Sequence, residues 1–225
     1  MTRSIQQPCN LAALPMMHPD PIEDTVLQRS ATDKGNETAR NILEQTKNIL
    51  SESGFSAISI RKVAEKCNIN PGNVSYYFKT RDALLEELAK YIFDRWENRF
   101  FEKMPTSVVT DLEKFVYSVE YMIQENKRLK TVVVLQEMWA MSNHSPAVMR
   151  MMDAFYGRMR HWIEAMLQAV NPDQDISTRQ TRAALITAQI EGLMILIGPN
   201  RVEHSELSGL EAEAVVQITR LALAE

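Results

Sequence analysis

The chain has 225 residues, of which 45% are hydrophobic and 24% charged, a composition typical of a globular protein with one large domain or two small ones. A net charge of −4 excludes a chain that is basic throughout, as some nucleic-acid-binding and membrane-surface proteins are. Two cysteines, Cys9 and Cys67, exclude a disulfide framework and fit a reducing cytoplasm. We expect no membrane partner, because the most apolar run, 193–197, is too short to cross a bilayer.

Residues 1–36 are expected to form a mostly disordered arm. Four of the nine prolines fall in this segment and its hydrophobic periodicity is weak. It lacks the apolar stretch of a secretory signal and the dense Lys and Arg of a DNA-binding tail. A short helix after Pro21 is the one regular element that we expect there.

From Glu37 onward the apolar residues recur with helical spacing, and we find no convincing alternating strand segment. The first helix is predicted over about 37–53, and Gly54 is suited to end it. Ser59 is the candidate N-cap of a second helix. The apolar face of this helix is formed at i, i+3, i+4 and i+7 by Ile60, Val63, Ala64 and Cys67.

A short third helix is predicted over about 71–78 and a long fourth helix over about 80–103. Asn70 is the expected N-cap of the third helix, and Pro71 takes the favoured first position. Thr80 is the expected cap of the fourth helix.

Five further amphipathic helices are predicted over about 108–125, 128–141, 145–170, 176–198 and 207–224, separated by Asn, Gly and Pro residues. The predicted fold is therefore all-α. A small N-terminal bundle, 37–85, is followed by a larger helical domain, 86–225.

Two short helices joined by a tight turn within 54–85 describe a helix-turn-helix. A reading helix must be held by a few apolar contacts on one side and leave the other side free for the major groove. Val74 and Phe78 lie four residues apart and are expected to face the core with Ile69. The residues left for the open side are Pro71, Gly72, Asn73, Ser75, Tyr76 and Tyr77.

The chemistry of the open side suits DNA. Gly72 lets the backbone approach closely, and Asn73 and Ser75 can hydrogen-bond base edges or phosphates. Tyrosine hydroxyls can donate to phosphate oxygens, and basic residues after the helix can contact phosphates. Residues 59–81 carry five basic groups against one Glu. The alternative, an ordinary helical turn whose tyrosines only pack, does not account for this combination of caps, spacing and local charge.

The stretch GFSAISIRKVAEKCNINPGNVSYYFKTRDALL, residues 54–85, resembles the DNA-binding domain of TetR-family transcriptional regulators. The family pattern joins a Gly-aromatic pair, a Ser or Thr cap, an apolar helix, a capped turn, an aromatic-rich recognition helix and a following basic residue. The positions in step with it are Gly54, Phe55, Ser59, Ile60, Val63, Ala64, Ile69, Gly72, Val74, Tyr76, Tyr77, Phe78, Lys79, Arg81 and Leu84. The resemblance implies a three-helix DNA-binding domain over about 37–85.

Three positions depart from the family pattern. Asn70 replaces the usual Ser cap and is expected to do the same work. Ser75 stands where many members have a phosphate-binding tyrosine. Arg81 replaces the commoner Lys, which preserves a cation for phosphate. The candidate DNA-binding residues are Ser59, Arg61, Gly72, Asn73, Ser75, Tyr76, Tyr77, Lys79 and Arg81.

The resemblance also implies that 86–225 senses a small ligand and forms the dimer. Helices 176–198 and 207–224 are apolar on more than one face, so each must be buried on more than one face. We expect these two helices to form a homodimer interface. The alternative is that both are central helices of a monomer.

Thirteen methionines suggest an adaptable apolar pocket, although such a stripe is more often simply core. The polar groups that could orient a ligand are Glu137, His161 and Glu191. Glu191 interrupts an apolar helix, and a buried carboxylate needs a partner unless it lies at a dimer seam. The candidate effector pocket comprises Tyr121, Met138, Trp139, Met152, Phe155, Met159, Trp162 and Glu191.

The sequence does not support an enzymatic function. The four histidines are scattered, and there is no His-Glu-x-x-His, Cys-x-x-Cys, phosphate loop or Gly-x-Ser-x-Gly. We expect no catalytic residues, no cofactor and no metal.

The prediction is a cytoplasmic, homodimeric repressor that binds double-stranded DNA and is released from a palindromic operator by a small apolar or amphipathic effector of unknown identity. The fourth helix, 80–103, is the expected lever between effector pocket and DNA. A second hypothesis keeps the DNA-binding domain and gives the C-terminal bundle a protein partner. Repressor and activator are not separated, because that depends on where the operator lies.

Overall fold

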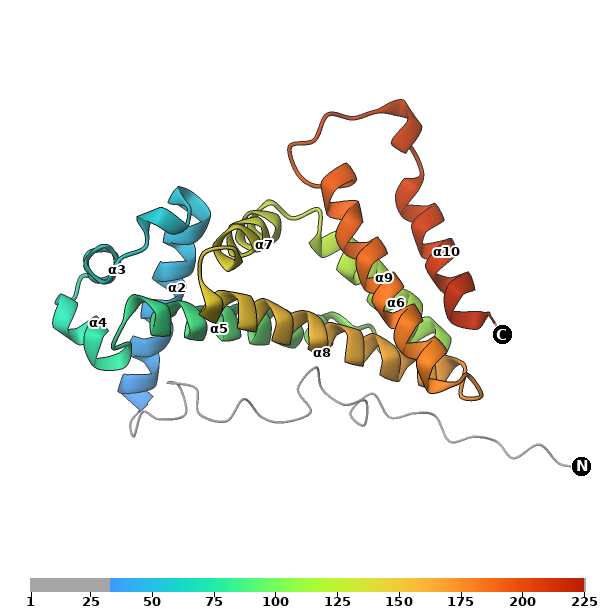
Figure 1. Ribbon diagram of the computed structural model, residues 1–225, viewed down its shortest axis with the longest axis horizontal. Coiled ribbons are helices and arrows are strands. Elements are labelled where there is room, and N and C mark those ends of the chain that lie inside the picture. Colours follow the sequence, from blue (N-terminus) through green and yellow to red (C-terminus); the bar gives the residue numbers. More distant parts are fainter. Residues whose placement is uncertain (1–32, 225) are drawn as a thin grey trace, which may run out of the picture. The chain divides into compact units, whose positions relative to one another are not determined.

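The computed structural model describes residues 33–224, apart from the side chains at 97 and 101 (Figure 1). Within that range every regular element is helical, which confirms the all-α prediction. The helices are α2 (Asp33–Ser53), α3 (Ile60–Cys67), α4 (Pro71–Tyr77), α5 (Arg81–Lys103), α6 (Asp111–Glu125), α7 (Leu129–Ser142), α8 (Pro146–Val170), α9 (Ile176–Ile197) and α10 (Leu210–Leu223), with 3₁₀ turns η2 (Phe55–Ala57) and η3 (Ser205–Leu207). The expected arm lies outside the described residues except for 33–36, which begin α2.

The described chain forms two compact units. The head unit comprises residues 33–99 and 133–155, and the C-terminal unit comprises residues 100–132 and 156–224. Helices α5, α7 and α8 each contribute residues to both units. The division expected between residues 85 and 86 falls inside α5.

The core of the head unit is built from one face of each of its first helices. Helix α2 buries a stripe that includes Ile42 and Leu43, and Thr46 within this stripe donates its hydroxyl to the carbonyl of Ile42 at 2.7 Å. Because that hydroxyl is satisfied, it does not disturb the apolar packing. Phe93 of α5 stacks on Phe155 of α8 with ring centroids 3.7 Å apart.

The local signals at helix ends are only partly those expected. Ser59 caps α3 by accepting a hydrogen bond from the Lys62 amide at 3.2 Å, as predicted. Asn70 stands at the N-cap of α4, but its side chain makes no cap hydrogen bond, so the expected replacement of a Ser cap is wrong in detail. The carbonyl of Asn70 instead accepts from the Asn73 amide at 2.9 Å.

Helix α6 begins at Asp111, three residues later than the predicted start at 108. Thr110 accepts from the Glu113 amide at 3.2 Å, and the Glu113 carboxylate accepts from the Thr110 amide at 2.8 Å. This reciprocal capping box fixes the helix start. The backbone hydrogen bond from Thr110 holds the pKa of Glu113 below its usual value.

The C-terminal unit has an aromatic core. Phe100 packs edge-to-face on Trp162 and on Tyr121, with ring centroids 4.9 and 5.2 Å away. Gly198 is the C-cap of α9, and a Cβ added there would lie 2.2 Å from the Met194 carbonyl oxygen. Between residues 33 and 224, no helix combines the length and apolarity needed to cross a membrane.

Candidate DNA-binding surface and effector site

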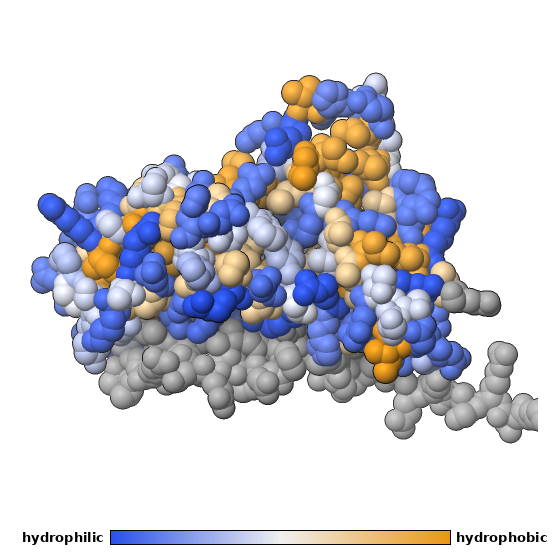
Figure 2. Space-filling view, in the orientation of Figure 1, coloured by the Kyte–Doolittle hydropathy of each residue, from blue (hydrophilic) through white to orange (hydrophobic). Residues whose placement is uncertain are grey.

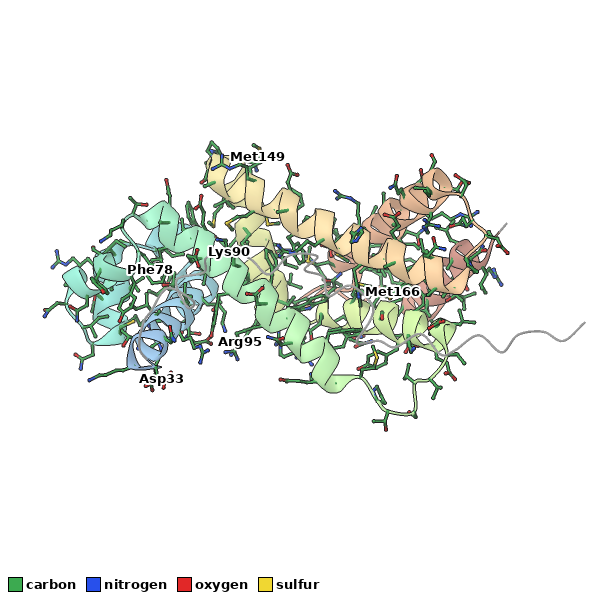
Figure 3. All side chains as sticks on the ribbon, turned by 90° about the horizontal axis from the view of Figure 1, so that it is seen from below. Asp33, Phe78, Lys90, Arg95, Met149 and Met166 are labelled. Atoms are coloured by element: carbon green, nitrogen blue, oxygen red, sulfur yellow. The ribbon has the colours of Figure 1, made fainter. Side chains whose placement is uncertain are left out.

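Helix α4 divides its side chains between the core and the outer surface. Phe78, at the C-terminal end of α4, is labelled in Figure 3. Phe78 is 1% exposed and Val74 is fully buried, whereas Tyr76 is 73% exposed. This is the division expected from the four-residue spacing, although Ile69 is only half-buried. The short helix is therefore held by two side chains and leaves its other face open.

The three aromatic residues at the end of α4 form a series from core to surface. Tyr77 packs against the buried Phe78 with centroids 6.4 Å apart, and Tyr76 meets the Tyr77 ring edge-on at 5.1 Å. The Lys79 ammonium lies 5.9 Å from the centroid of Tyr76. These contacts hold an exposed aromatic ring beside a cation.

The remaining expected contacts of α4 lie on the same helix. Gly72 and Asn73 are exposed, and Ser75 is half-buried. A Cβ added at Gly72 would meet no atom within 4 Å, and its backbone is not in the left-handed region. The folded chain itself therefore does not require glycine at 72, which suits a position where another molecule approaches the backbone.

Two candidates belong to α3 and its cap. The Ser59 oxygen is occupied as the cap acceptor, although a hydroxyl retains its own proton to donate. Arg61 is exposed in the first turn of α3. Two neighbouring lysines of the positive segment are paired with carboxylates, Lys62 with Glu65 at 3.6 Å and Lys66 with Glu52 at 3.1 Å.

Arg81 makes internal contacts that the sequence did not reveal. Its Nε donates to the Ile58 carbonyl at 2.8 Å and its Nη2 donates to the Phe55 carbonyl at 3.0 Å. The guanidinium carbon also lies 3.9 Å from the centroid of the Phe55 ring. These contacts engage two donors and one face of the guanidinium, which leaves fewer donors for the phosphate contact expected at this position.

Glu137 of α7, considered from sequence as a ligand-orienting group, contacts the same segment. Its carboxylate accepts a hydrogen bond from the Phe55 amide at 2.8 Å. Phe55 is therefore bound through its N–H by α7 and through its carbonyl by α5. Only the long-range packing could have disclosed this contact, because 82 positions separate the two residues.

The predicted effector-pocket residues divide between the two units. Met138, Trp139, Met152 and Phe155 belong to the head unit, and Tyr121, Met159, Trp162 and Glu191 belong to the C-terminal unit. Most of them are buried, but Trp139 is 48% exposed and does not fit an enclosed pocket. His161, the third polar candidate, has an exposed side chain 3.9 Å from Glu164.

Glu191 is the unusual polar group of the C-terminal unit. Tyr156 donates its hydroxyl to the Glu191 carboxylate at 2.8 Å, and the Asn126 side chain also hydrogen-bonds it. Burial raises the pKa of Glu191, and these two hydrogen bonds oppose that rise only in part. No cation among the described residues contributes to its stabilisation. Trp162 carries a second unusual group, a buried indole N–H that lacks an acceptor within the described part of the chain.

Helices α9 and α10 expose a row of aliphatic side chains in addition to their buried faces. Figure 2 shows hydrophobic surface gathered over the region of these two helices. On α9 the exposed members include Leu185 and Leu196, and on α10 they include Val216 and Leu223. Each pair is spaced by a near-integral number of turns, eleven or seven residues, so each forms a row on one helix face.

The loop between α9 and α10 covers an open cavity of about 730 Å³. Its lining comes from residues 196–211 and Lys127, and none of the predicted pocket residues takes part. Among the described residues, no three His, Cys, Asp or Glu side chains are grouped as metal ligands.

Comparisons with known proteins agree with this geometry. Residues 42–88 match the family model described as "Bacterial regulatory proteins, tetR family", and residues 118–220 match that described as "BetI-type transcriptional repressor, C-terminal". The first match covers α3, α4 and the segment between them, including the exposed Tyr76.

Curated relatives are helix-turn-helix transcriptional regulators. YttP of Bacillus subtilis is 32% identical over 57 residues, covering 25% of this chain and 28% of that protein. UidR of Escherichia coli K12 is 27% identical, covering 51% of this chain and 57% of that protein. A regulator from the dhlA 5′ region of Xanthobacter autotrophicus is 25% identical, covering 62% and 68%. The chain thus matches between 28% and 68% of the length of these curated relatives.

Solved structures share the fold. A transcriptional regulator of Streptomyces coelicolor superposes with a TM-score of 0.64 at 19% identity, over 84% of this chain and 99% of the other. A regulator of Saccharomonospora viridis, solved in complex with choline, gives a TM-score of 0.60 at 20% identity, over 83% and 93%. Two family models and the named relatives converge on one assignment, and the shared fold agrees with it. The chain belongs to the TetR family of bacterial transcriptional regulators.

Proposed function

We propose that the chain is a homodimeric repressor that places α4 of each copy in the major groove of a near-palindromic operator and leaves the DNA when an effector binds. The observation that carries the DNA half is the exposed Tyr76, supported by Tyr77 and flanked by Lys79. An aromatic hydroxyl, a cation and an open helix face at Gly72 together suit a groove bordered by phosphates. Such a protein acts in the cytoplasm, where the chromosome lies.

The exposed rows of α9 and α10 support the dimer. The large aliphatic side chains exposed on these two helices include Leu185, Leu196, Val216 and Leu223, and contiguous exposed apolar surface commonly marks a protein interface. Two copies that pair these rows about a two-fold axis would cover them and present two reading helices. Half-sites about 34 Å apart on DNA would then match the two-fold symmetry of the protein.

Glu191 supports an effector that carries a positive charge. A buried carboxylate without a cation is costly, and a bound organic cation would supply the missing charge. The choline complex of a regulator with a similar fold favours a small quaternary ammonium or amine over a purely apolar compound. Of the apolar and amphipathic effectors predicted from the sequence, we therefore propose an amphipathic cation.

The DNA half is tested by selection from a random duplex library with the purified protein. We expect enrichment of a near-palindrome whose half-sites are about one helical turn apart, and light scattering should give a dimer. A monomer in solution, or enrichment without symmetry, would contradict the proposal.

The effector half is tested with Glu191→Gln and choline as the probe. Choline should raise the melting temperature of the wild type and not that of the variant. Because burial raises the folded pKa of Glu191, its ionised form destabilises the fold as pH rises through that pKa. Glu191→Gln should therefore be the more stable protein at pH 7, and the difference should vanish below the ordinary carboxyl pKa of about 4.3. If choline raises the melting temperature of both proteins equally, Glu191 is not part of the effector site.

A protein partner for the C-terminal unit is the second candidate function. Met159 and Met166 are buried, at 2% and 3% exposure, and a core that is closed around them would favour this function. A melting temperature that responds to no amine or quaternary ammonium would favour this reading.

A further inference from the structure

Residues 54–58 form the joint between α2 and the helix-turn-helix. Gly54 follows α2 with a φ of 73°, the η2 turn comes next, and Ile58 is 2% exposed immediately before the Ser59 cap of α3. The path of these residues determines where α3 begins. It therefore also affects α4, which follows α3 after a three-residue turn.

Two helices from other parts of the chain hold this joint from two sides. From α7, the Glu137 carboxylate binds the Phe55 amide at 2.8 Å. From α5, Arg81 binds the carbonyls of Phe55 and Ile58 at 3.0 and 2.8 Å, and its guanidinium covers the Phe55 ring. A charged group thus engages each polar end of Phe55, and hydrogen bonds to charged groups are the stronger kind.

The fit of Glu137 against the joint is close. A Cβ placed on Gly54 would lie 3.3 Å from both carboxylate oxygens of Glu137. Glu137 is half-buried, and Phe55 N–H is the hydrogen-bond donor that the structure gives it. The close fit allows an acceptor oxygen at the end of a side chain of this length.

We propose that Glu137, Phe55 and Arg81 form a two-sided clamp that sets the orientation of the helix-turn-helix, which makes Glu137 a positioning residue for operator recognition although it lies outside the DNA-binding domain. This inference rests on the proposed DNA-binding function. Residues 129–132 at the start of α7 belong to the C-terminal unit and Glu137 belongs to the head unit. Helix α7 is therefore a covalent connection along which a change in the C-terminal unit can reach the joint.

Three variants separate positioning from charge. Glu137→Ala removes the acceptor, Glu137→Asp keeps the charge but withdraws it by one methylene, and Glu137→Gln keeps an acceptor oxygen at full length without the charge. We expect Glu137→Ala and Glu137→Asp to weaken binding to the selected operator about tenfold. Glu137→Gln should stay within about threefold of the wild type, and Gln136→Ala, an exposed neighbour on α7, should have no effect.

Two further measurements distinguish positioning from a loss of folding. Affinity for non-specific DNA should be unchanged in all four variants, because phosphate contacts are not removed. Hydrogen exchange of the Phe55 amide should accelerate in Glu137→Ala and not in Gln136→Ala. Wild-type operator affinity in Glu137→Ala, with faster Phe55 exchange, would overturn the proposal. Equal losses for operator and non-specific DNA would overturn it as well, since they indicate a general defect.

The exchange experiment also separates this inference from the proposed function. If the wild type selects no operator, the DNA-binding proposal is wrong. The positioning role of Glu137 is then wrong as well, even if faster Phe55 exchange in Glu137→Ala shows that the hydrogen bond exists. If the wild type selects an operator and Phe55 exchange is the same in all variants, the clamp alone is wrong.

Discussion

Two regions of the molecule expose large hydrophobic side chains that differ in chemistry. On α4 the exposed large side chain is Tyr76, which carries a hydroxyl and lies beside the Lys79 ammonium. On α9 and α10 the exposed side chains are aliphatic, including Leu196 and Val216. A tyrosine can bind a hydrated, charged partner. Aliphatic side chains contribute favourably to the free energy of binding only when the contact excludes water.

This difference indicates what each surface binds. The α4 surface suits a polyanion that remains hydrated, and its binding should depend on salt. The α9–α10 surface suits an apolar protein surface that excludes water. The same rows on a second copy of the chain form such a surface in a symmetric dimer. Exposure by itself does not identify a binding site, but the kind of atom exposed does restrict the partner.

The largest expected effect comes from placing a charge in the aliphatic row. Leu196→Asp should weaken the dimer by about 3 kcal/mol over the two copies, roughly 100-fold in the dissociation constant. The cause is the loss of two buried leucines, together with the burial of two carboxylates. Light scattering over a concentration series measures it, and operator binding should fall with the dimer.

Leu129→Asp is the matched control for that change. Leu129 is 50% exposed and Leu196 is 46% exposed, but Leu129 lies on α7 rather than in the row. The control should remain dimeric. If both variants dissociate equally, or neither does, the α9–α10 row is not the interface.

The next effect concerns the aromatic side chain of the DNA surface. Tyr76→Ala should weaken operator binding by about 1–2 kcal/mol, because it removes a contact that the packing on Tyr77 holds in place. Tyr76→Phe keeps the ring and should lose about half of that. Fluorescence anisotropy measures both, with the dimer constant unchanged. Undiminished binding of Tyr76→Ala would remove this side chain from the interface.

A change in salt dependence is expected from Lys79→Ala. Each lost phosphate contact lowers the salt slope by about 0.9, so a dimer should lose nearly 2. The loss should be the same for operator and for unrelated DNA. Lys66→Ala serves for comparison, because Lys66 is already paired with Glu52 at 3.1 Å, and its slope should change little. Identical slopes for wild type and Lys79→Ala would show that this lysine contacts no phosphate.

The smallest effect is expected at Gly72. Gly72→Ala should leave the free protein as stable or up to about 1 kcal/mol more stable, because alanine favours a helix and the added methyl meets nothing. Operator affinity should nevertheless fall a few-fold if the backbone approaches DNA there. Thermal unfolding and anisotropy on the same preparation measure the two quantities. A variant that is destabilised as well as weaker would show that glycine serves the fold instead.

Short-range patterns predicted the head unit well. The spacing of Val74 and Phe78 gave the buried side of α4, and the hydroxyl of Ser59 gave the start of α3. These features depend on neighbours within one or two turns, which a sequence displays directly. The start of α6 was predicted too early, because the prediction used apolar spacing alone. The capping box of Thr110 and Glu113 is the sequence signal that indicates the correct start.

Long-range contacts could not be predicted in the same way. Arg81 was predicted to contact phosphate because it follows the recognition helix in the sequence. Only the fold shows that it lies against the carbonyls of Phe55 and Ile58. Glu137 was considered as a ligand group for the same reason, since nothing in its own helix points to residue 55. The methionine stripe likewise could not separate core from pocket, and it did not separate core from surface either. Met152 is buried, whereas Met149 on the same helix is 50% exposed.

The contact between Gly54 and Glu137 has an evolutionary consequence. Gly54 cannot be replaced without strain, because its φ is 73° and an added Cβ would press on the Glu137 carboxylate. Mutational drift at one position should therefore be constrained by the other. Among relatives that retain glycine at the position of Gly54, we expect Glu or Gln at that of Glu137, and the two positions should change together where the lineage has lost the clamp.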